Sequence, residues 1–147
     1  MPADIRLFYG ELREECVEMY ISVFNSPPWN ERWTKESAEE RLRELTRNPS
    51  FVGFAVTKSE RAVGYAFCCA NTWWSRKELH IEHIFVANEE QGKGYGKALL
   101  DGIEAYMREN DIHGLNLLTN RNLPCAAFYE KNGFYAIDQL RYFGKRI

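Results

Sequence analysis

Gln91-Gly92-Lys93-Gly94-Tyr95-Gly96-Lys97 stands between a predicted strand that ends at residue 86 and a predicted helix that starts near residue 94. Glycines at this point allow the backbone to come close to a ligand, and unpaired N–H groups at the start of a helix bind phosphate oxygens. The segment therefore predicts a binding site for a phosphate-bearing ligand.

Two common nucleotide-binding motifs do not fit this segment. A Walker A loop that ends at Lys97 requires glycine at position 91 and serine or threonine at position 98, and the chain has Gln91 and Ala98. The dinucleotide-binding fingerprint starting at Gly92 requires glycine at position 97 and a parallel sheet before it, whereas the preceding strands are predicted to be antiparallel. Neither motif explains the glycines.

Hydrophobic periodicity on both sides of the segment predicts alternating strands and helices around one central sheet. Strands are expected over residues 5–9, 51–58, 62–72, 78–86 and 114–119, and helices over 12–23, from the N-cap Thr34 to Asn48-Pro49, over 94–110, and over 124–132 with Gly133 as the C-cap. Residues 134–144 are expected to supply two further short strands. The predicted fold is a single α/β (α+β) domain over residues 1–147, with a mixed, mostly antiparallel sheet flanked by helices in the order β-α-α-β-β-β-α-β-α-β-β.

The composition is that of a globular protein and excludes several classes of function. The chain has 147 residues, 45% of them hydrophobic, and its net charge of -2 with a pI near 6.0 argues against nucleic acid as a partner. No apolar stretch approaches the ~20 residues that span a bilayer, and residues 1–6 lack the pattern of a signal peptide. We therefore expect no membrane partner and a cytoplasmic location.

The four cysteines give no indication of a metal site or a disulfide. Cys16, Cys68, Cys69 and Cys125 lack the CxxC spacing of metal ligands, and adjacent strand residues such as Cys68 and Cys69 point to opposite faces. All four are expected to be buried thiols, and no bound metal is expected.

Two sequence blocks connect the chain to a known family. Gln91, Gly94 and Gly96 fit the pattern Gln-x-x-Gly-x-Gly, and a later block runs from Asn122 to Tyr129 seven positions on and continues as Glu-Lys-x-Gly-Phe. With these blocks in this order, the chain resembles the GNAT superfamily of acetyl-CoA-dependent N-acetyltransferases over nearly its whole length. The stretch 24–34, followed by an acidic helix, further resembles bacterial aminoglycoside 6'-N-acetyltransferase-like members.

The resemblance implies that acetyl-CoA is the cofactor and that the glycine-rich loop holds its pyrophosphate. A backbone N–H of the strand at residues 84–86 is then expected to polarise the thioester carbonyl. The lysines in this set add positive charge near the phosphates or are ordinary solvated side chains. The implied cofactor contacts are Ile84, Phe85, Val86, Gln91, Gly92, Lys93, Gly94, Tyr95, Gly96, Lys97, Asn122, Phe128 and Lys131.

Transfer of an acetyl group to an amine also needs an acid and, for a charged amine, a base. Tyr129, in the position where the family carries its tyrosine, is the candidate acid for the departing thiolate; otherwise it is a packed aromatic residue. Strand alternation places His80 and Glu82 on one face and His83 on the other. Glu82 acting through a water is ranked first as the base, His80 second and His83 third, with arrival of a neutral amine as the remaining alternative. Many relatives have glutamate at the position of His83.

The acceptor is expected to be a small-molecule amine. Trp29, Trp33, Trp73 and Trp74 fall in loops that could form a pocket wall and make cation–π contacts, or could simply cover the edge of the core. Residues 1–50 hold ten acidic and seven basic residues, a balance that suits a cationic, aminoglycoside-like acceptor without requiring one. An enzyme acting on protein amines and a non-catalytic acyl-CoA-binding module are the alternatives. The strand around Tyr142-Phe143 could serve as an edge in a homodimer.

Overall fold

The computed structural model describes residues 3–147, and its elements follow the predicted ones closely as far as residue 131. No helix in this range is long and apolar enough to cross a membrane. In chain order the elements are β1 (Asp4–Phe8), α1 (Glu14–Phe24), α2 (Lys35–Arg47), β2 (Phe51–Lys58), β3 (Arg61–Thr72), β4 (Lys77–Val86), the 3-10 helix η1 (Asn88–Glu90), α3 (Tyr95–Glu109), β5 (Gly114–Leu117) and α4 (Cys125–Lys131).

The start of α2 illustrates how local sequence sets these bounds. The Thr34 hydroxyl oxygen accepts a hydrogen bond from the Ser37 backbone N–H at 3.1 Å, and the Ser37 hydroxyl oxygen accepts one from the Thr34 backbone N–H at 3.0 Å. This capping box satisfies two backbone donors that the helix itself leaves unpaired. The predicted N-cap at Thr34 is confirmed.

The five strands form one sheet in the order β1-β2-β3-β4-β5. Successive strands from β1 to β4 pair antiparallel, and β5 pairs parallel with β4 after the chain crosses over through α3. The sheet is therefore mixed and mostly antiparallel, as predicted.

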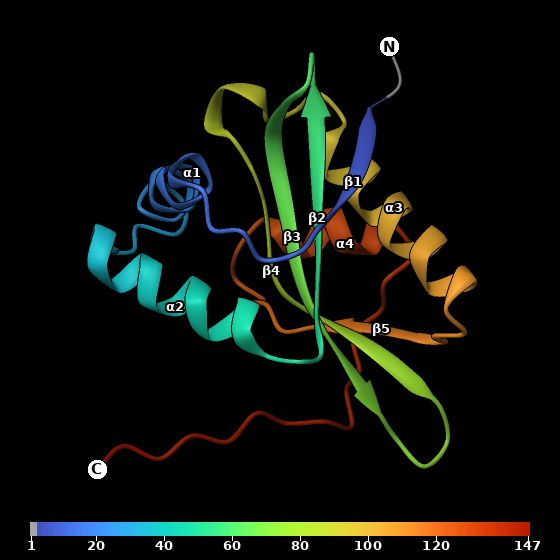
Figure 1. Ribbon diagram of the computed structural model, residues 1–147. Helices are drawn as coiled ribbons and strands as arrows, with labels where there is room; N and C mark the ends of the chain where they lie inside the picture. The colour runs from blue at the N-terminus through green and yellow to red at the C-terminus, as the bar shows by residue number, and fades with distance from the viewer. Residues whose placement is uncertain (1–2) are drawn as a thin grey trace.

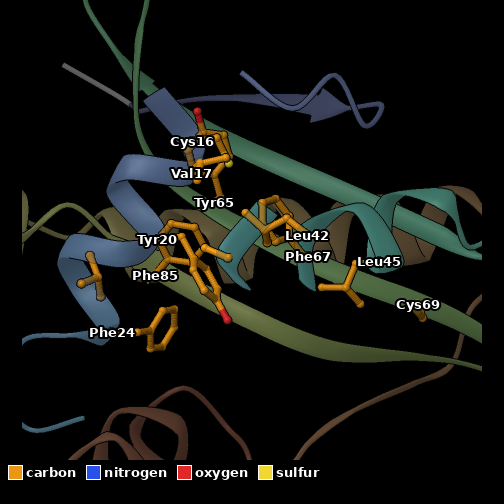
Figure 2. Close-up of a cluster of buried hydrophobic side chains, with 12 residues drawn as sticks. Cys16, Val17, Tyr20, Phe24, Leu42, Leu45, Tyr65, Phe67, Cys69 and Phe85 are labelled. Atoms are coloured by element: carbon orange, nitrogen blue, oxygen red, sulfur yellow. The ribbon is translucent and has the colours of Figure 1, made fainter. Parts of the chain in front are cut away.

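The sheet separates two hydrophobic cores, with α1 and α2 on one face and α3 on the other (Figure 1). Figure 2 shows the core on the α1/α2 face, where Tyr20 of α1 and Leu42 of α2 pack against strand residues such as Phe85. On the α3 face, Leu99 and Ile103 belong to the second cluster.

The cysteines divide between the two cores much as expected. Cys68 belongs to the cluster on the α3 face and Cys69 to the cluster on the α1/α2 face, so the predicted opposite orientations are confirmed. Cys16 is also buried, Cys125 is only half-buried, and all four are free thiols.

A β-bulge in the middle of β4 makes the predicted alternation of faces wrong. Phe67 of β3 pairs with His83, but the next residue, Cys68, pairs with Ile81, so Glu82 is the extra residue. The bulge shifts the alternation by one position, and His80 and His83 therefore lie on the same face of the sheet. The α1/α2 face carries His80, His83 and Phe85, whereas the α3 face carries Leu79, Ile81, Ile84 and Val86.

The two strands predicted within residues 134–144 are absent, which corrects the end of the predicted element order. Beyond Phe134, every residue up to Ile147 is exposed, and the backbone forms one turn, closed by the Leu140 N–H donating to the Ile137 carbonyl at 3.2 Å. The segment runs away from the sheet to the C-terminus (Figure 1). A strand needs a neighbouring strand to pair with its backbone groups, and this segment meets none in its own chain.

Candidate active site

The pairing between β4 and β5 is incomplete, and this leaves a gap between these two strands near one edge of the sheet. Residues 78–81 of β4 pair with residues 114–117, and β5 ends there while β4 continues to Val86. Residues 82–86 therefore have no strand on their β5 side, and the backbone groups along that edge are available to another molecule. The predicted carbonyl-binding residues Ile84, Phe85 and Val86 lie on this stretch.

The glycine-rich loop connects the end of β4 to the N-terminal end of α3. Gly92 and Gly94 have φ angles of 77° and 91°, and a Cβ added at either would meet no atom within 4 Å. The first hydrogen bond at the helix start runs from the Ala98 N–H to the Gly94 carbonyl, so the preceding amides have no partner within the helix. The loop thus presents open space and unpaired N–H donors, which suit phosphate oxygens.

Gln91 fixes this loop to the strand. Its side-chain amide donates to the Val86 carbonyl at 3.0 Å and lies 3.3 Å from Asn88 Oδ1. Lys93 and Lys97 instead form exposed ion pairs with Glu90 and Asp101, at 3.2 and 2.9 Å. Exposed pairs of this kind are worth little, so both ammonium groups can turn toward an anion at small cost.

Helix α4 packs on the start of α3. A Cβ on Gly96 would lie 3.1 Å from the Phe128 ring, so the absence of a side chain there lets the two helices approach. Phe128 belongs with Ile84 and Val86 to the core on the α3 face, which brings α4 toward the unpaired stretch of β4. Asn122 and Lys131, the other predicted cofactor contacts on this side, are exposed.

Tyr129 is half-buried between Phe128 and Phe134, with ring centroids 5.3 and 5.5 Å away. Burial, assisted by Cys125, raises the pKa of Tyr129 to about 12. Among residues 3–147 its hydroxyl has no hydrogen-bond partner. The phenol therefore stays protonated at neutral pH and is free to donate a hydrogen bond.

A polar cluster surrounds the bulge on the α1/α2 face, and it includes an arginine that the sequence analysis missed. Arg41 of α2 donates from Nε to His83 Nε2 at 3.2 Å and from Nη2 to Glu82 Oε2 at 3.1 Å. The Tyr20 hydroxyl lies 3.4 Å from the same His83 nitrogen. Because Nε2 accepts, the His83 proton is on Nδ1.

The environment of His83 keeps the ring neutral. Burial lowers its pKa to about 4, with a further contribution from the positive charge of Arg41. Arg41 lies in the densely charged sequence of α2, Lys35–Arg47. Its spacing from the buried Ala38 and Leu45, three and four positions away, is the signal that places it beside the buried stripe of α2.

His80 has different partners. Its Nδ1 contacts Asn116 Oδ1 on β5, and the Asn116 amide nitrogen lies 3.5 Å from Glu78 Oε1. Glu78 in turn accepts two hydrogen bonds from Arg76, at 3.1 and 2.9 Å. The acidic partner orients the Asn116 oxygen toward His80, so Nδ1 carries the proton and Nε2 keeps a free lone pair.

The four tryptophans do not lie together along one side of a pocket. Trp29 and Trp33 pack beside Phe24 and Tyr20, with ring centroids 5.5 and 5.1 Å apart, and so lie close to the polar cluster. Trp73 and Trp74 are 56% and 97% exposed in the turn between β3 and β4. That turn is about 20 Å from His83 along β4 at the usual rise per residue.

A wide cleft lies away from these residues. It has a volume of about 940 Å³ between α1 and the β2–β3 turn, and none of the predicted site residues lines it. Within the described part of the chain, no group of three or more histidine, cysteine or acidic side chains is arranged to hold a metal ion.

Comparisons with known proteins agree with this architecture. The acetyltransferase (GNAT) family model matches residues 14–134. A possible acetyltransferase from Clostridium difficile 630 superposes with a TM-score of 0.85 at 16% identity, covering 100% of this chain and 99% of that one. A GNAT family acetyltransferase from Staphylococcus aureus gives 0.69 at 17% identity, covering 100% of both chains.

A third similar structure is an aminoglycoside acetyltransferase from an uncultured soil metagenomic sample, solved in complex with sisomicin. Its TM-score is 0.76 at 16% identity, and the match covers 99% of this chain and 97% of that one. No curated protein matches the chain at a significant level of sequence similarity.

The fold and the family match together define an acyltransferase. The chain belongs to the acetyltransferase (GNAT) family, because the family model spans most of its length, and the resemblance found in the sequence is confirmed.

Proposed function

We propose that the protein transfers the acetyl group of acetyl-CoA to a primary amine of a small molecule, by direct attack within a ternary complex. The observation that supports this most is the unpaired stretch of β4, residues 82–86, beside the open N-terminal end of α3. The unpaired stretch of β4 offers backbone N–H donors to a carbonyl oxygen, and the N-terminal end of α3 offers backbone N–H donors to phosphates. The two are joined by the short loop that Gln91 anchors.

The residues around the loop fit acetyl-CoA, which when bound supplies a thioester carbonyl open to attack by an amine. The unpaired amides of residues 92–97 would hold the pyrophosphate, with Lys93 and Lys97 turning from their exposed ion pairs. A backbone N–H within residues 84–86 would donate to the carbonyl oxygen. Phe128 and Asn122 would line the opposite side, and Lys131 would approach the phosphate end.

His80 is the base that the hydrogen bonds favour. Arg41 donates one hydrogen bond to the accepting nitrogen of His83 and another to Glu82 Oε2, so both acceptor atoms are already engaged. His80 Nε2 has no such partner, and Asn116 holds the ring in the required tautomer. His80 lies four to six positions before the carbonyl-binding amides, roughly 10–17 Å along β4 when the bulged residue is discounted. It would therefore accept the amine proton through a chain of bridging waters.

Tyr129 completes the reaction as a hydrogen-bond donor. As the amine nitrogen bonds to the carbonyl carbon and the carbon–sulfur bond breaks, negative charge develops on sulfur. With its pKa raised to about 12, the Tyr129 phenol stabilises this thiolate by donating a hydrogen bond rather than by giving up its proton fully.

The acceptor class we propose is a polyamine sugar of the aminoglycoside type. Trp29 and Trp33 offer aromatic faces beside the polar cluster, where an ammonium group or a sugar ring can pack. An aminoglycoside acetyltransferase is among the similar structures, at 16% identity. Trp73 and Trp74 lie too far along β4 to share this role.

The test is acetyl-CoA-dependent thiol release across aminoglycosides, polyamines, amino acids and short peptides, with product masses measured. We expect one added acetyl group on an aminoglycoside-like amine. Acetylation of peptides alone would favour the protein-acetyltransferase alternative. Acetyl-CoA binding without transfer to any amine would contradict the proposal and favour a non-catalytic acyl-CoA-binding module.

Replacing Tyr129 with phenylalanine should lower kcat about 10- to 100-fold while the Kd for acetyl-CoA stays unchanged, since only the donor to the developing thiolate is lost. Tyr9→Phe, at an exposed tyrosine outside the site, is the matched control and should behave as wild type. An unchanged kcat in Tyr129→Phe would remove the proposed role.

His80→Gln should lower kcat/KM about 100-fold or more, because glutamine keeps a polar side chain but cannot accept the amine proton. Glu82→Gln and His83→Gln provide the comparison at the two neighbouring candidates. A loss in Glu82→Gln larger than the loss in His80→Gln would assign the base to Glu82 instead.

A further inference from the structure

Asn88, the first residue of η1, joins the glycine-rich loop to the end of α1. Its Oδ1 accepts a hydrogen bond from Gln91 Nε2 at 3.3 Å. Its Nδ2 donates to the Ser22 carbonyl at 3.1 Å and to Ser26 Oγ at 3.3 Å, which lie 66 and 62 positions earlier in the sequence. The oxygen and both N–H groups of this amide are therefore in use.

The contact at Ser22 satisfies a carbonyl near the end of α1. The helix ends at Phe24, and carbonyls in the last turn of a helix have no following N–H partner within it. The Ser22 carbonyl also accepts a hydrogen bond from Ser26 Oγ at 2.6 Å. Asn88 thus caps α1 from a different element and fixes the place where the loop of residues 25–34 begins.

The 25–34 loop is held together by hydrogen bonds of its own. Asn25 Nδ2 donates to the Trp33 carbonyl at 3.0 Å, and the Trp33 backbone N–H donates to Asn25 Oδ1 at 2.8 Å. The Trp29 backbone N–H donates to the Ser26 carbonyl at 3.1 Å. The loop is therefore one unit with the end of α1, and this unit sets the position of both tryptophans.

We propose that Asn88 is a positioning residue, which sets the place of Trp29 and Trp33 relative to the glycine-rich loop. The inference rests on the proposed function, in which that loop holds acetyl-CoA and the two tryptophans contact the acceptor. Gln91 shares its side-chain amide between Asn88 and the Val86 carbonyl at the end of β4. One hydrogen-bonded network thus joins both binding regions, and acetyl transfer depends steeply on how well they are aligned.

Restraint of the glycine-rich loop should reach the tryptophans by this route. Once residues 91–97 hold the pyrophosphate, Gln91 has less freedom to move, and its bond to Asn88 passes the restraint to the end of α1. The 25–34 loop should then fluctuate less, which makes Trp29 and Trp33 less accessible to a small quencher.

Asn110 provides a matched control, because its side chain makes the same kind of contact at the end of another helix. Its Nδ2 donates to the Tyr106 carbonyl at 2.8 Å, in the last turn of α3. Leucine is close to asparagine in size and forms no hydrogen bond. Asn88→Leu and Asn110→Leu should therefore lower stability in the same way, and only Asn88→Leu should affect the 25–34 loop.

The first test is acrylamide quenching of tryptophan fluorescence, which needs no acceptor. Trp73→Phe/Trp74→Phe removes the two tryptophans outside the site and leaves Trp29 and Trp33 as the reporters. In this background, saturating acetyl-CoA should lower the quenching constant about 2-fold. Asn88→Leu should remove this protection while the Kd for acetyl-CoA from calorimetry stays the same, and Asn110→Leu should keep it.

The contrary outcomes of this test are distinct. No protection in the unmodified background, or equal protection in Asn88→Leu, would overturn the inference, because bound coenzyme would then act on the tryptophans without Asn88 or not at all. Failure of acetyl-CoA to bind would overturn the proposed function, and this inference with it.

The second test separates positioning from a general loss of stability through kinetics. Asn88→Leu should raise the KM of the acetylated amine about 5- to 10-fold, with kcat and the KM of acetyl-CoA changed by less than about 2-fold. Asn88→Asp keeps the acceptor for Gln91 but loses both donors to α1, so it should behave like Asn88→Leu. Asn110→Leu should leave all three constants unchanged. An unchanged KM for the amine in both Asn88 variants would show that the residue has no positioning role.

Discussion

At the scale of single residues, Arg41 determines how the polar groups of β4 behave. Its guanidinium donates hydrogen bonds to both His83 Nε2 and Glu82 Oε2, so each of these two acceptor atoms already has a donor. His80 is held instead by Asn116, a neutral partner that orients the ring without occupying Nε2. Two histidines three positions apart on one strand thus acquire different chemistry from different neighbours.

His83 also makes stability depend on pH. Its pKa is about 4 in the folded protein and near 6.5 in the unfolded chain, where the ring is not buried. Below pH 6.5 the unfolded chain therefore binds a proton on this ring that the folded protein does not bind. The free energy of unfolding should therefore fall by about 2 kcal/mol between pH 7 and pH 4.5 on account of this residue. Urea denaturation at the two pH values measures it.

The matched variants for this measurement are His83→Gln and His113→Gln. His83→Gln should lose about 2 kcal/mol less on acidification than wild type, whatever its stability at pH 7. His113→Gln, at an exposed histidine, should keep the wild-type difference. An identical acid dependence in His83→Gln and wild type would contradict the neutral, buried state of the ring.

At the scale of elements, the N-terminal end of α3 suits an anion because the glycine-rich loop before it leaves the backbone N–H groups accessible. Gly94 has a φ of 91°, a conformation that costs an L-residue about 1 kcal/mol, and its missing side chain leaves the helix start open. Alanine at this position places a methyl group where a phosphate would approach the amides.

Gly94→Ala should therefore weaken coenzyme A binding at least about 10-fold, as measured by titration calorimetry, and lower stability by about 1 kcal/mol. Gly133, which follows α4, provides a close control because its φ is also 91° and a Cβ there would also meet nothing within 4 Å. Gly133→Ala should cost similar stability with unchanged binding. Equal affinities in the two variants would argue against a phosphate site at α3.

At the scale of the whole molecule, the early end of β5 is what connects the two faces of the sheet. Helices α3 and α4 lie on one side with the glycine-rich loop and Tyr129, and α1 and α2 lie on the other with Arg41, Trp29 and Trp33 (Figure 1). A thioester held between β4 and β5 is reachable from both sides. In the proposed reaction, the acetyl donor and the acceptor would bind from opposite faces and meet at residues 82–86.

The sequence by itself determined the elements up to residue 131, the mixed sheet and the family. These depend on local signals, because apolar spacing, the cap at Thr34 and the glycines of residues 91–97 act over a few neighbouring positions. The candidate site residues on the loop and on β4 are predicted from local signals too, as a short glycine pattern and as polar residues in a buried strand, and their roles stay predictions.

Only the tertiary structure decided three features. These are the side of the sheet on which each β4 side chain lies, the hydrogen-bond partners of its polar groups, and whether residues 134–144 form strands. The bulge at Glu82 depends on the register with β3, and Arg41 and Asn116 contact β4 residues that are 41 and 36 positions away in sequence. Residues 134–144 have a strand-like sequence and meet no strand in their own chain. Strand pairing and burial depend on which segments meet in space. The pattern of residues in one segment shows which secondary structure that segment favours, but it does not show which other segment will pack against it.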